Sequence, residues 1–324
     1  MARVLTVGAA QLGPIQKAES RTSVVNRMLA LVESANDKGC DLIVFTELSL
    51  TTFFPRWYME DQDEVDQWFE AEMPGPDTQA LFDTTRQYQM AFHLGYAELI
   101  EENGELHRYN TAVLVDRDGQ IAGKYRKVHL PGHDEFDTER DFQHLEKRYF
   151  EVGNLGFPVW RFLDGIFGMC ICNDRRWPET YRVMGLQGVE MVVLGYNTPT
   201  TNSQSDEAPH VRAFHNLISM QAGAYQNSTW VVGVAKAGNE EGCDLLGDSS
   251  IIAPSGEVVA QCSTVGDELV SATVDLDMCA KYKETLFDFA RYRRPEVYKT
   301  ITSQAGVEIP DGVAPGKSDS EDQE

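Results

Sequence analysis

Short apolar runs alternate with segments of helical periodicity along most of the chain. Apolar runs of about four to eight residues bounded by polar residues are typical of buried strands, and apolar residues that recur every three or four positions are typical of amphipathic helices. The pattern predicts strands over residues 4–10, 41–45, 91–99, 167–172, 191–195 and 229–235. It predicts helices over residues 22–38, 77–88, 178–188 and 210–226.

The remaining apolar runs predict further strands. Residues 108–127 are expected to form a hairpin that turns at Asp118-Gly119, and residues 249–253, 258–260 and 271–274 are expected to be strands with a turn over residues 254–256. Alternation of strands and helices indicates a layered α/β domain. No repeat or low-complexity linker divides the chain, so we expect one domain over residues 1–303.

Residues 304–324 are expected to form an acidic C-terminal tail. From residue 310 onward the tail has almost no large apolar side chain, and its charges sum to −4. A segment that cannot bury apolar surface does not offset the entropy of ordering, so we expect this tail to be disordered.

The composition excludes several classes of function. The 324 residues include 28 Lys+Arg and 51 Asp+Glu, which gives a formal net charge of −23 and argues against nucleic-acid or anionic-membrane partners. No segment approaches the roughly 20 apolar residues that cross a bilayer. The first apolar run is followed directly by Gln11 and Gly13-Pro14, so it is interpreted as a strand and not a signal peptide.

Six cysteines without a CxxC spacing favour a reducing, cytoplasmic location without disulfides, and no metal site is expected.

The sharpest chemical signal is GMCICNDRRWPE, residues 168–179, in which a strand ends at Cys172 and Pro178 opens a helix. A cysteine at such a junction lies beside free backbone N–H groups and can act as a nucleophile. The alternative is an inert, packed cysteine, which is the interpretation we give to Cys170.

Two other predicted strands end near a charged residue. Glu47 follows the DLIVF run, and Lys127 ends the GKYRK run. A thiol needs a nearby base or cation to react at neutral pH. Each charge alone is usual for a solvated strand end, but a carboxylate, an ammonium and a thiol at three strand ends together indicate a catalytic constellation.

These same blocks resemble a known family. The nitrilase superfamily, with its Glu-Lys-Cys triad, is matched by FTELSLTTFFPRW, GKYRKVHLPG and CNDRRWPE. Its branch of N-carbamoyl-D-amino-acid amidohydrolases is matched also by EMPGP, FQHLEKRYFE, LGFPV, GYNTPT and SMQAGAYQN. The resemblance extends to about residue 300, whereas residues 202–212 differ from that branch. It implies a four-layer α-β-β-α sandwich.

The resemblance also implies roles for individual residues. Cys172 is the expected nucleophile, Glu47 the general base, and Lys127 the oxyanion-stabilising cation. Glu146 is expected to orient the lysine and the substrate. The other expected site residues are Asn173, whose backbone N–H would bind the oxyanion, the carboxylate-binding Arg175 and Arg176, the pocket residues His144, Asn197 and Thr198, and the supporting His129 and His215.

The function implied is hydrolysis of N-carbamoyl-D-amino acids through a covalent cysteine intermediate, with no cofactor or metal. The expected partners are this small-molecule substrate and further copies of the chain in a homo-oligomer, a dimer or a tetramer. The alternatives are another nitrilase-superfamily amidase or a β-ureidopropionase, and, outside the enzymes, a catalytically idle assembly scaffold.

Overall fold

The computed structural model describes residues 2–140, 142–201 and 207–309. The chain divides into two compact units, residues 1–287 and 288–324. The predicted boundary after residue 303 stays a prediction, and residues 310–324 of the predicted tail lie outside the described residues. The described part of the second unit contains the short helical segments α8 (Phe289–Tyr292), η4 (Pro295–Val297) and α9 (Lys299–Ser303).

The first unit is built on two mixed sheets. The first has the strand order β14-β1-β2-β3-β4-β5, in which β1, β2 and β3 are parallel and the other neighbours are antiparallel. Its strands are β1 (Val4–Gln11), β2 (Leu42–Val44), β3 (Ala91–Glu102), β4 (Glu105–Val115), β5 (Ile121–Arg126) and β14 (Glu268–Asp275).

The second sheet has the order β13-β12-β9-β8-β7-β6, with β7, β8 and β9 parallel. Its strands are β6 (Val159–Phe162), β7 (Gly165–Ile171), β8 (Met191–Tyr196), β9 (Trp230–Ala235), β12 (Ser250–Ile252) and β13 (Val258–Gln261). A separate hairpin pairs β10 (Ala237–Glu240) with β11 (Cys243–Leu246).

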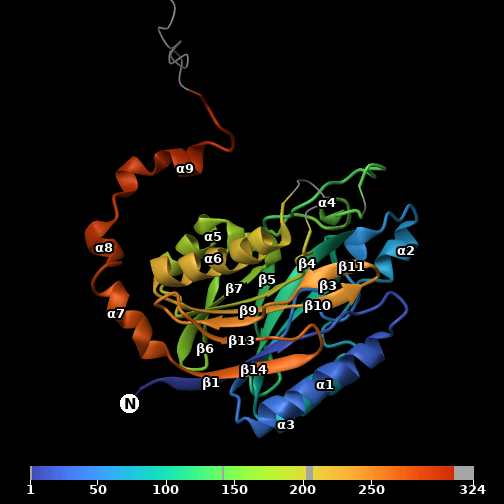
Figure 1. Cartoon of the computed structure of the whole chain (residues 1–324), viewed down its shortest axis with the longest axis horizontal. Coiled ribbons are helices and arrows are strands. Elements are labelled where there is room, and N and C mark those ends of the chain that lie inside the picture. Colours follow the sequence, from blue (N-terminus) through green and yellow to red (C-terminus); the bar gives the residue numbers. More distant parts are fainter. Residues whose placement is uncertain (1, 141, 202–206, 310–324) are drawn as a thin grey trace, which may run out of the picture. The chain divides into compact units, whose positions relative to one another are not determined.

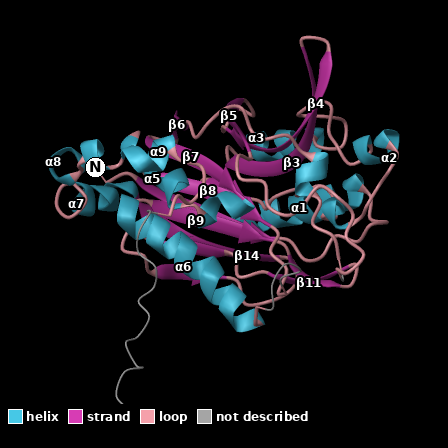
Figure 2. Cartoon of the chain, turned by 90° about the horizontal axis from the view of Figure 1, so that it is seen from above, coloured by secondary structure: helices cyan, strands magenta, loops and turns pink. Residues whose placement is uncertain are grey.

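Helices cover the outer faces of both sheets, which gives the expected four-layer α-β-β-α sandwich. In Figure 1, α1 (Arg21–Asp37) and α3 (Gln79–Gln87) lie outside the first sheet, and α5 (Pro178–Leu186) and α6 (Pro209–Asn227) lie outside the second. Figure 2 shows α5 and α6 running over β8 and β9. No helix among the described residues is long and apolar enough to span a membrane.

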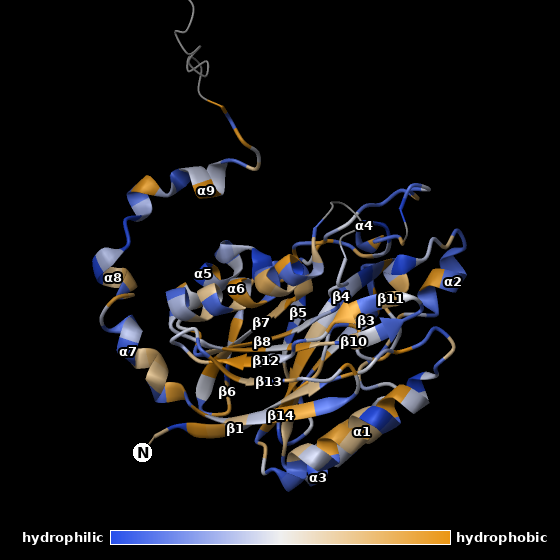
Figure 3. Ribbon diagram, in the orientation of Figure 1, coloured by the Kyte–Doolittle hydropathy of each residue, from blue (hydrophilic) through white to orange (hydrophobic). Residues whose placement is uncertain are grey.

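The run DLIVF shows how the sequence produces these layers. Leu42 and Val44 pack between the sheets with residues of β7, β8 and β9, whereas Ile43 and Phe45 pack towards α1 and α3. Successive side chains of a strand point to opposite faces, so a strand covered on both faces is apolar at every position. Figure 3 shows the apolar residues gathered on the sheets and on the inner sides of the helices.

The bounds of most predicted elements are confirmed to within a few residues. The predicted hairpin over residues 108–127 is only part of a longer antiparallel arrangement. The expected turn between residues 108 and 127 exists as the connection between β4 and β5. However, β4 already begins at Glu105 and also pairs along its whole length with β3. The shorter segments are η1 (Phe54–Arg56), α2 (Gln62–Asp66), α4 (Glu146–Tyr149), η2 (Cys172–Arg176), η3 (Leu276–Cys279) and α7 (Ala280–Lys283).

Candidate active site

Glu47, Lys127 and Cys172 lie at the ends of strands from both sheets. Glu47 follows β2 in the loop after that strand, Lys127 directly follows β5, and Cys172 directly follows β7. The carboxyl ends of parallel strands meet at one edge of a sheet, which is where α/β proteins place their ligand sites. Folding therefore brings together three residues that are far apart in the sequence.

The backbone at Glu47 is wedged between the two sheets. A Cβ atom on Gly195 of β8 would lie 2.1 Å from the Glu47 nitrogen, and a Cβ atom on Gly95 of β3 would lie 2.6 Å from the Thr46 carbonyl oxygen. Atoms at such distances overlap, so any side chain at either glycine would push this loop away. The two glycines therefore allow the Glu47 backbone to lie close to both sheets.

A buried ammonium is shared by two buried carboxylates. Lys127 Nζ lies 2.7 Å from Oε1 of Glu47 and 2.5 Å from Oε2 of Glu146, and none of the three side chains is exposed. The Asn110 side-chain amide donates to Glu47 Oε1 at 2.8 Å, and the Asn197 backbone N–H donates to Glu47 Oε2 at 2.9 Å. Each Glu47 oxygen is thus held in place by donors from other strands.

The contacts between Lys127 and Glu146 keep both of these groups charged despite their burial. Burial alone would lower the pKa of Lys127, but the electrostatic influence of Cys172, which is negative only when it is ionised, and of Glu146 and Glu47 raises it above its ordinary value. Burial raises the pKa of Glu146, but the Lys127 ammonium and the hydrogen bond from His144 bring it below its ordinary value. Lys127 is therefore a permanent cation in the site.

Cys172 begins the 3₁₀ turn η2 with a left-handed backbone. Its φ angle is +48°, a conformation that costs a non-glycine residue about 1–3 kcal/mol and is common where a side chain must be presented to a ligand. Burial and then the charge of Glu47 raise the pKa of the thiol to about 11, while Lys127 acts in the opposite direction. The thiol of the resting protein is protonated at neutral pH and needs a base to become nucleophilic.

Asp174 holds this turn in place. Its Oδ2 accepts hydrogen bonds from the Ile171 N–H at 3.0 Å and the Tyr125 hydroxyl at 2.7 Å. Its Oδ1 accepts the His129 N–H at 2.9 Å and lies 2.8 Å from His129 Nδ1. The fully buried carboxylate thus ties the turn after β7 to β5 and to the segment after Lys127.

The two predicted carboxylate-binding arginines have different surroundings. The Arg175 guanidinium is buried and donates to the Cys172 carbonyl at 2.5 Å, to Asn216 Oδ1 at 2.7 and 3.1 Å and to Thr198 Oγ1 at 2.9 Å. No described residue forms a hydrogen bond or an ion pair with the Arg176 guanidinium, and Arg176 lines the pocket that contains Cys172. The charge of Arg175 and then burial lower the pKa of Arg176 to about 10, still well above neutral pH.

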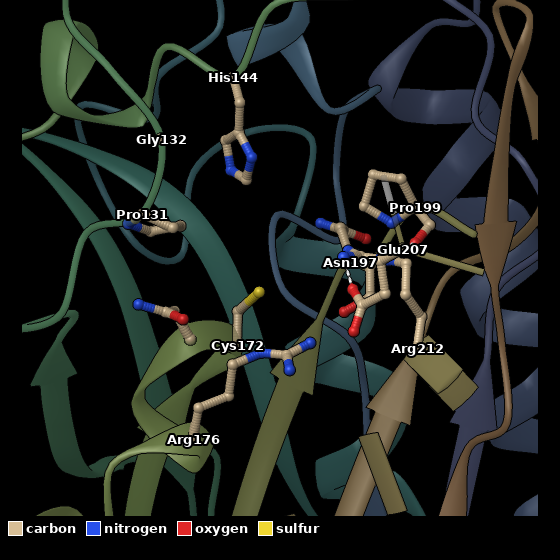
Figure 4. A pocket seen from close by; sticks show the side chains of 11 residues that line it. Pro131, Gly132, His144, Cys172, Arg176, Asn197, Pro199, Glu207 and Arg212 are labelled. Atoms are coloured by element: carbon tan, nitrogen blue, oxygen red, sulfur yellow. Dashed lines mark hydrogen bonds and ion pairs between the residues drawn. The ribbon is translucent and has the colours of Figure 1, made fainter. Parts of the chain in front are cut away.

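The pocket has a volume of about 330 Å³ and opens beside the thiol. Figure 4 shows the side chains of Cys172, Arg176 and His144 projecting into it, with Glu207 and Arg212 on the side opposite Pro131. The residues that line it are Pro131, Gly132, His144, Cys172, Asn173, Arg176, Asn197, Thr198, Pro199, Glu207 and Arg212.

His144, Asn173, Asn197 and Thr198 therefore line one pocket, and their contacts with a substrate stay a prediction. His144 Nε2 lies 3.0 Å from Glu146 Oε1, so this imidazole connects the pocket to the buried carboxylate–ammonium cluster. The Asn197 side-chain amide also donates to the Glu47 carbonyl at 3.0 Å.

The two supporting histidines do not line the pocket. His129 is held by Asp174 and stacks between Trp177, at 4.8 Å between ring centroids, and Phe157, at 5.8 Å. His215 contacts a residue that lines the pocket, with its Nδ1 2.6 Å from Glu207 Oε1. Each contacts a residue that shapes the site.

The sequence prediction omitted four residues that matter for this geometry, namely Asn110, Asp174, Glu207 and Arg212. Asn110 lies on a strand and Asp174 in a quoted motif, but nothing in the one-dimensional pattern marks either as a hydrogen-bonding partner. Glu207 and Arg212 belong to residues 202–212, which differ from the resembled branch and of which residues 202–206 lie outside the described residues. No group of three or more His, Cys, Asp or Glu residues in the described chain has a geometry that could hold a metal ion.

Comparison with known proteins agrees with this arrangement. The sequence profile described as "Carbon-nitrogen hydrolase" matches residues 6–284. N-carbamoylputrescine amidase of Arabidopsis thaliana is 30% identical over 287 residues, which cover 85% of this chain and 89% of that protein. Citrullinase of Francisella tularensis is 32% identical over 200 residues, 60% of this chain and 65% of that protein. The crystal structure of a carbon-nitrogen hydrolase from Helicobacter pylori G27 superposes with a TM-score of 0.80 at 23% identity, covering 93% of this chain and 99% of that one.

Proposed function

Because the chain belongs to the carbon-nitrogen hydrolase family of the nitrilase superfamily, we propose that it hydrolyses N-carbamoyl-D-amino acids. The products are the D-amino acid, ammonia and carbon dioxide. The substrate presents a ureido carbonyl for attack and an α-carboxylate for binding. The pocket contains the Cys172 thiol, which can attack the carbonyl, and the Arg176 guanidinium, which can bind the carboxylate.

The observation that carries the proposal is that the Arg176 guanidinium, which has no hydrogen-bond or ion-pair partner among the described residues, lies in the same pocket as the Cys172 thiol. Guanidinium groups bind carboxylates through paired, charge-assisted hydrogen bonds. The neighbouring Arg175 cation makes an anion at this position more favourable, because two adjacent positive charges then share one negative charge. A substrate without a carboxylate would leave this cation unmatched inside the pocket.

Glu47 acts as the general base in the proposed formation of the covalent intermediate. Its carboxylate takes the Cys172 proton as sulfur attacks the ureido carbon, and the oxyanion receives the Lys127 ammonium and the Asn173 N–H. Removing one oxyanion donor typically costs about 3–4 kcal/mol of transition-state stabilisation. Glu47 then returns the proton to the terminal nitrogen, the C–NH₂ bond breaks, ammonia leaves, and the amino acid remains joined to sulfur as a thiocarbamate.

The second half of the reaction uses the same groups in reverse. Glu47 takes a proton from water, which attacks the thiocarbamate carbon, and the C–S bond breaks as the thiol is reprotonated. The released carbamate loses carbon dioxide to give the free amine. One carboxylate therefore acts as base, acid and base again, which requires that it stay close to both sulfur and the leaving group.

The preference for the D hand is proposed from the NDRRWPE and GYNTPT blocks of the sequence. The relatives N-carbamoylputrescine amidase and citrullinase also carry names of ureido substrates. A second candidate is N-carbamoyl-β-alanine, the substrate class of a β-ureidopropionase, because its carboxylate would also reach Arg176. The packed triad argues against an idle scaffold, which has no need of a strained cysteine.

Ammonia release from a substrate panel tests the proposal. The panel contains N-carbamoyl-D-alanine, its L enantiomer, N-carbamoyl-β-alanine, N-carbamoylputrescine and propionamide. We expect the highest kcat/KM for N-carbamoyl-D-alanine. Preference for N-carbamoyl-β-alanine would support the second candidate, turnover of only N-carbamoylputrescine or propionamide would refute both, and no turnover at all would favour the scaffold.

A further inference from the structure

The walls of the active-site pocket are polar almost throughout. Apart from Pro131, Gly132 and Pro199, every described residue that lines the pocket carries a polar or ionisable side chain. Ligand pockets are usually lined mainly by apolar and aromatic side chains. This pocket therefore differs from one built to receive a large apolar group.

One polar wall is formed by a cluster of charged side chains around Glu207. Its Oε2 lies 3.0 Å from Arg212 Nη1, and its Oε1 lies 2.6 Å from His215 Nδ1. Arg212 Nε also donates to the Pro199 carbonyl at 2.7 Å, which fixes the guanidinium against the wall. Burial raises the pKa of Glu207, but the hydrogen bonds from Arg212 and His215 bring it below its ordinary value, so Glu207 is an acceptor and Arg212 a donor at neutral pH.

The two ends of the substrate are already assigned under the proposed function, on which this inference rests. The ureido group lies at Cys172, and the α-carboxylate lies at Arg176. The Glu207–Arg212 pair remains as a charged surface of the same pocket that has no assigned contact with the substrate. The part of the substrate left to face it is the amino-acid side chain.

We propose that the Glu207–Arg212 pair is the side-chain subsite, and that it selects N-carbamoyl amino acids with an uncharged side chain that both donates and accepts hydrogen bonds, such as a carboxamide. The carbonyl of such a group accepts from the Arg212 guanidinium, and its N–H donates to the Glu207 carboxylate. An anionic side chain would be repelled by Glu207 and a cationic one by Arg212. An apolar side chain would exclude water from both charges without replacing its hydrogen bonds.

Asparagine and leucine side chains make the sharpest comparison because they are nearly isosteric and differ in polarity. We expect kcat/KM for N-carbamoyl-D-asparagine to exceed that for N-carbamoyl-D-leucine by roughly tenfold or more, since sites built to hydrogen-bond a polar group discriminate against analogues that lack it. An equal rate, or a faster rate with the leucine compound, would overturn the inference.

The Arg212→Met variant assigns this preference to the pair. In this variant, the ratio of kcat/KM for N-carbamoyl-D-asparagine to kcat/KM for N-carbamoyl-D-leucine should fall at least fivefold. The reason is that the substrate loses its donor, while Glu207 keeps only His215 as a partner. The matched control is Arg86→Met, which removes an arginine paired to a carboxylate at 2.9 Å on the exposed face of α3 and should keep the wild-type ratio. The Glu207→Gln variant retains the shape of the wall and should also reduce the ratio.

The outcomes separate this inference from the proposed function. If N-carbamoyl-D-alanine is hydrolysed but the asparagine-to-leucine ratio is unaffected by Arg212→Met and Glu207→Gln, only the side-chain subsite is refuted. If no N-carbamoyl amino acid is hydrolysed while another amide is, the proposed function itself fails. If a variant does not fold, the side-chain subsite is still tested by the wild-type protein, through its kcat/KM for N-carbamoyl-D-asparagine relative to that for N-carbamoyl-D-leucine.

Discussion

Lys127 Nζ lies 2.7 Å from Oε1 of Glu47, in a site where neither side chain reaches solvent. The same ammonium lies 2.5 Å from Glu146, so a single positive charge offsets two negative ones. In a medium of low dielectric constant, removal of this cation leaves two carboxylates facing each other without compensation. The oxyanion-stabilising group of the proposed mechanism is therefore also a structural element.

The first prediction concerns the stability of this cluster. Lys127→Met should lower the free energy of unfolding by about 3–5 kcal/mol, the usual cost of leaving a buried charge unpaired. Lys127→Met combined with Glu146→Gln should recover part of that loss, because only one buried carboxylate remains. Urea unfolding at pH 7 measures both values. A double variant as unstable as the single one would contradict the shared-charge interpretation.

The second prediction concerns the reactivity of Cys172. Its thiol pKa is raised to about 11, so below that pH the thiolate fraction increases tenfold for each pH unit. Alkylation by iodoacetamide, followed by mass spectrometry of the Cys172 peptide, should accelerate steadily from pH 7 to 9.5. An ordinary thiol reaches half of its maximal rate near pH 8.5. A plateau below pH 8 would show instead that the resting site holds a thiolate beside Lys127.

The third prediction separates the two adjacent arginines. Arg176→Leu should reduce kcat/KM for N-carbamoyl-D-alanine roughly 10- to 100-fold, mainly through KM, because hydrogen bonds to charged groups contribute about 1.5–3 kcal/mol. Hydrolysis of propionamide, if detectable, should change little. Arg176→Lys should restore part of the affinity. Arg175→Leu serves as the comparison: it leaves buried acceptors on Asn216 and Thr198 unpaired and should lower Tm.

The fourth prediction is a pH dependence of stability that originates from His93. This buried side chain has Nδ1 3.0 Å from the Phe45 carbonyl, and burial lowers its pKa from 6.5 to about 4. The unfolded chain binds the proton near pH 6.5 and the folded chain only near pH 4, so stability is lost as the pH falls between these values. The loss amounts to about 3 kcal/mol at most.

The His93→Asn variant tests that contribution. Between pH 7 and pH 4.5, the free energy of unfolding should fall less in this variant than in the wild type, because Asn does not titrate. Urea unfolding at several pH values gives both slopes. Parallel slopes would mean that carboxylates alone account for the acid sensitivity.

The fifth prediction concerns salt. Of the net charge of −23, −4 lies on residues 310–324, and the remainder opposes an anionic substrate. Charges further than about 8 Å apart are largely screened at physiological ionic strength, so moderate salt weakens this long-range repulsion more than the contact with Arg176. When NaCl is raised from about 50 to about 300 mM, the electrostatic screening length shortens, and KM for N-carbamoyl-D-alanine should stay the same or decrease. A marked rise in KM would show that the local cations, and not the overall charge, dominate.

The sequence predicts the layers and the strand-end residues because both depend on local pattern. The DLIVF and GMCIC runs mark buried strands, so Glu47, two residues after the first run, and Cys172, at the end of the second, are expected at the edges of the sheets. By contrast, β10 (Ala237–Glu240) contains Ala-Gly-Asn-Glu, which has no apolar alternation. Its pairing with β11 depends on tertiary contacts, so the sequence pattern does not reveal it.

Partners from distant segments decide what the remaining site residues do. Arg175 and Arg176 are adjacent and chemically identical, but Arg175 is engaged by Asn216 of α6 and Thr198 after β8, while Arg176 is not. Glu207 and Arg212 become parts of the pocket because Pro199 and His215 hold them there. None of these contacts has a periodic signature in one dimension.

The glycines on either side of the Glu47 backbone link the active site to the interior of the fold. Gly95 and Gly195 belong to different sheets, and each leaves no room for even a methyl group against the loop between them. The spacing of the two sheets therefore also determines the position of Glu47, the proposed general base. A substitution deep in the inter-sheet core that widens this spacing by a few tenths of an ångström would shift the base while every residue of the pocket stays unchanged. Attempts to stabilise this enzyme by repacking its core should be judged by turnover as well as by melting temperature.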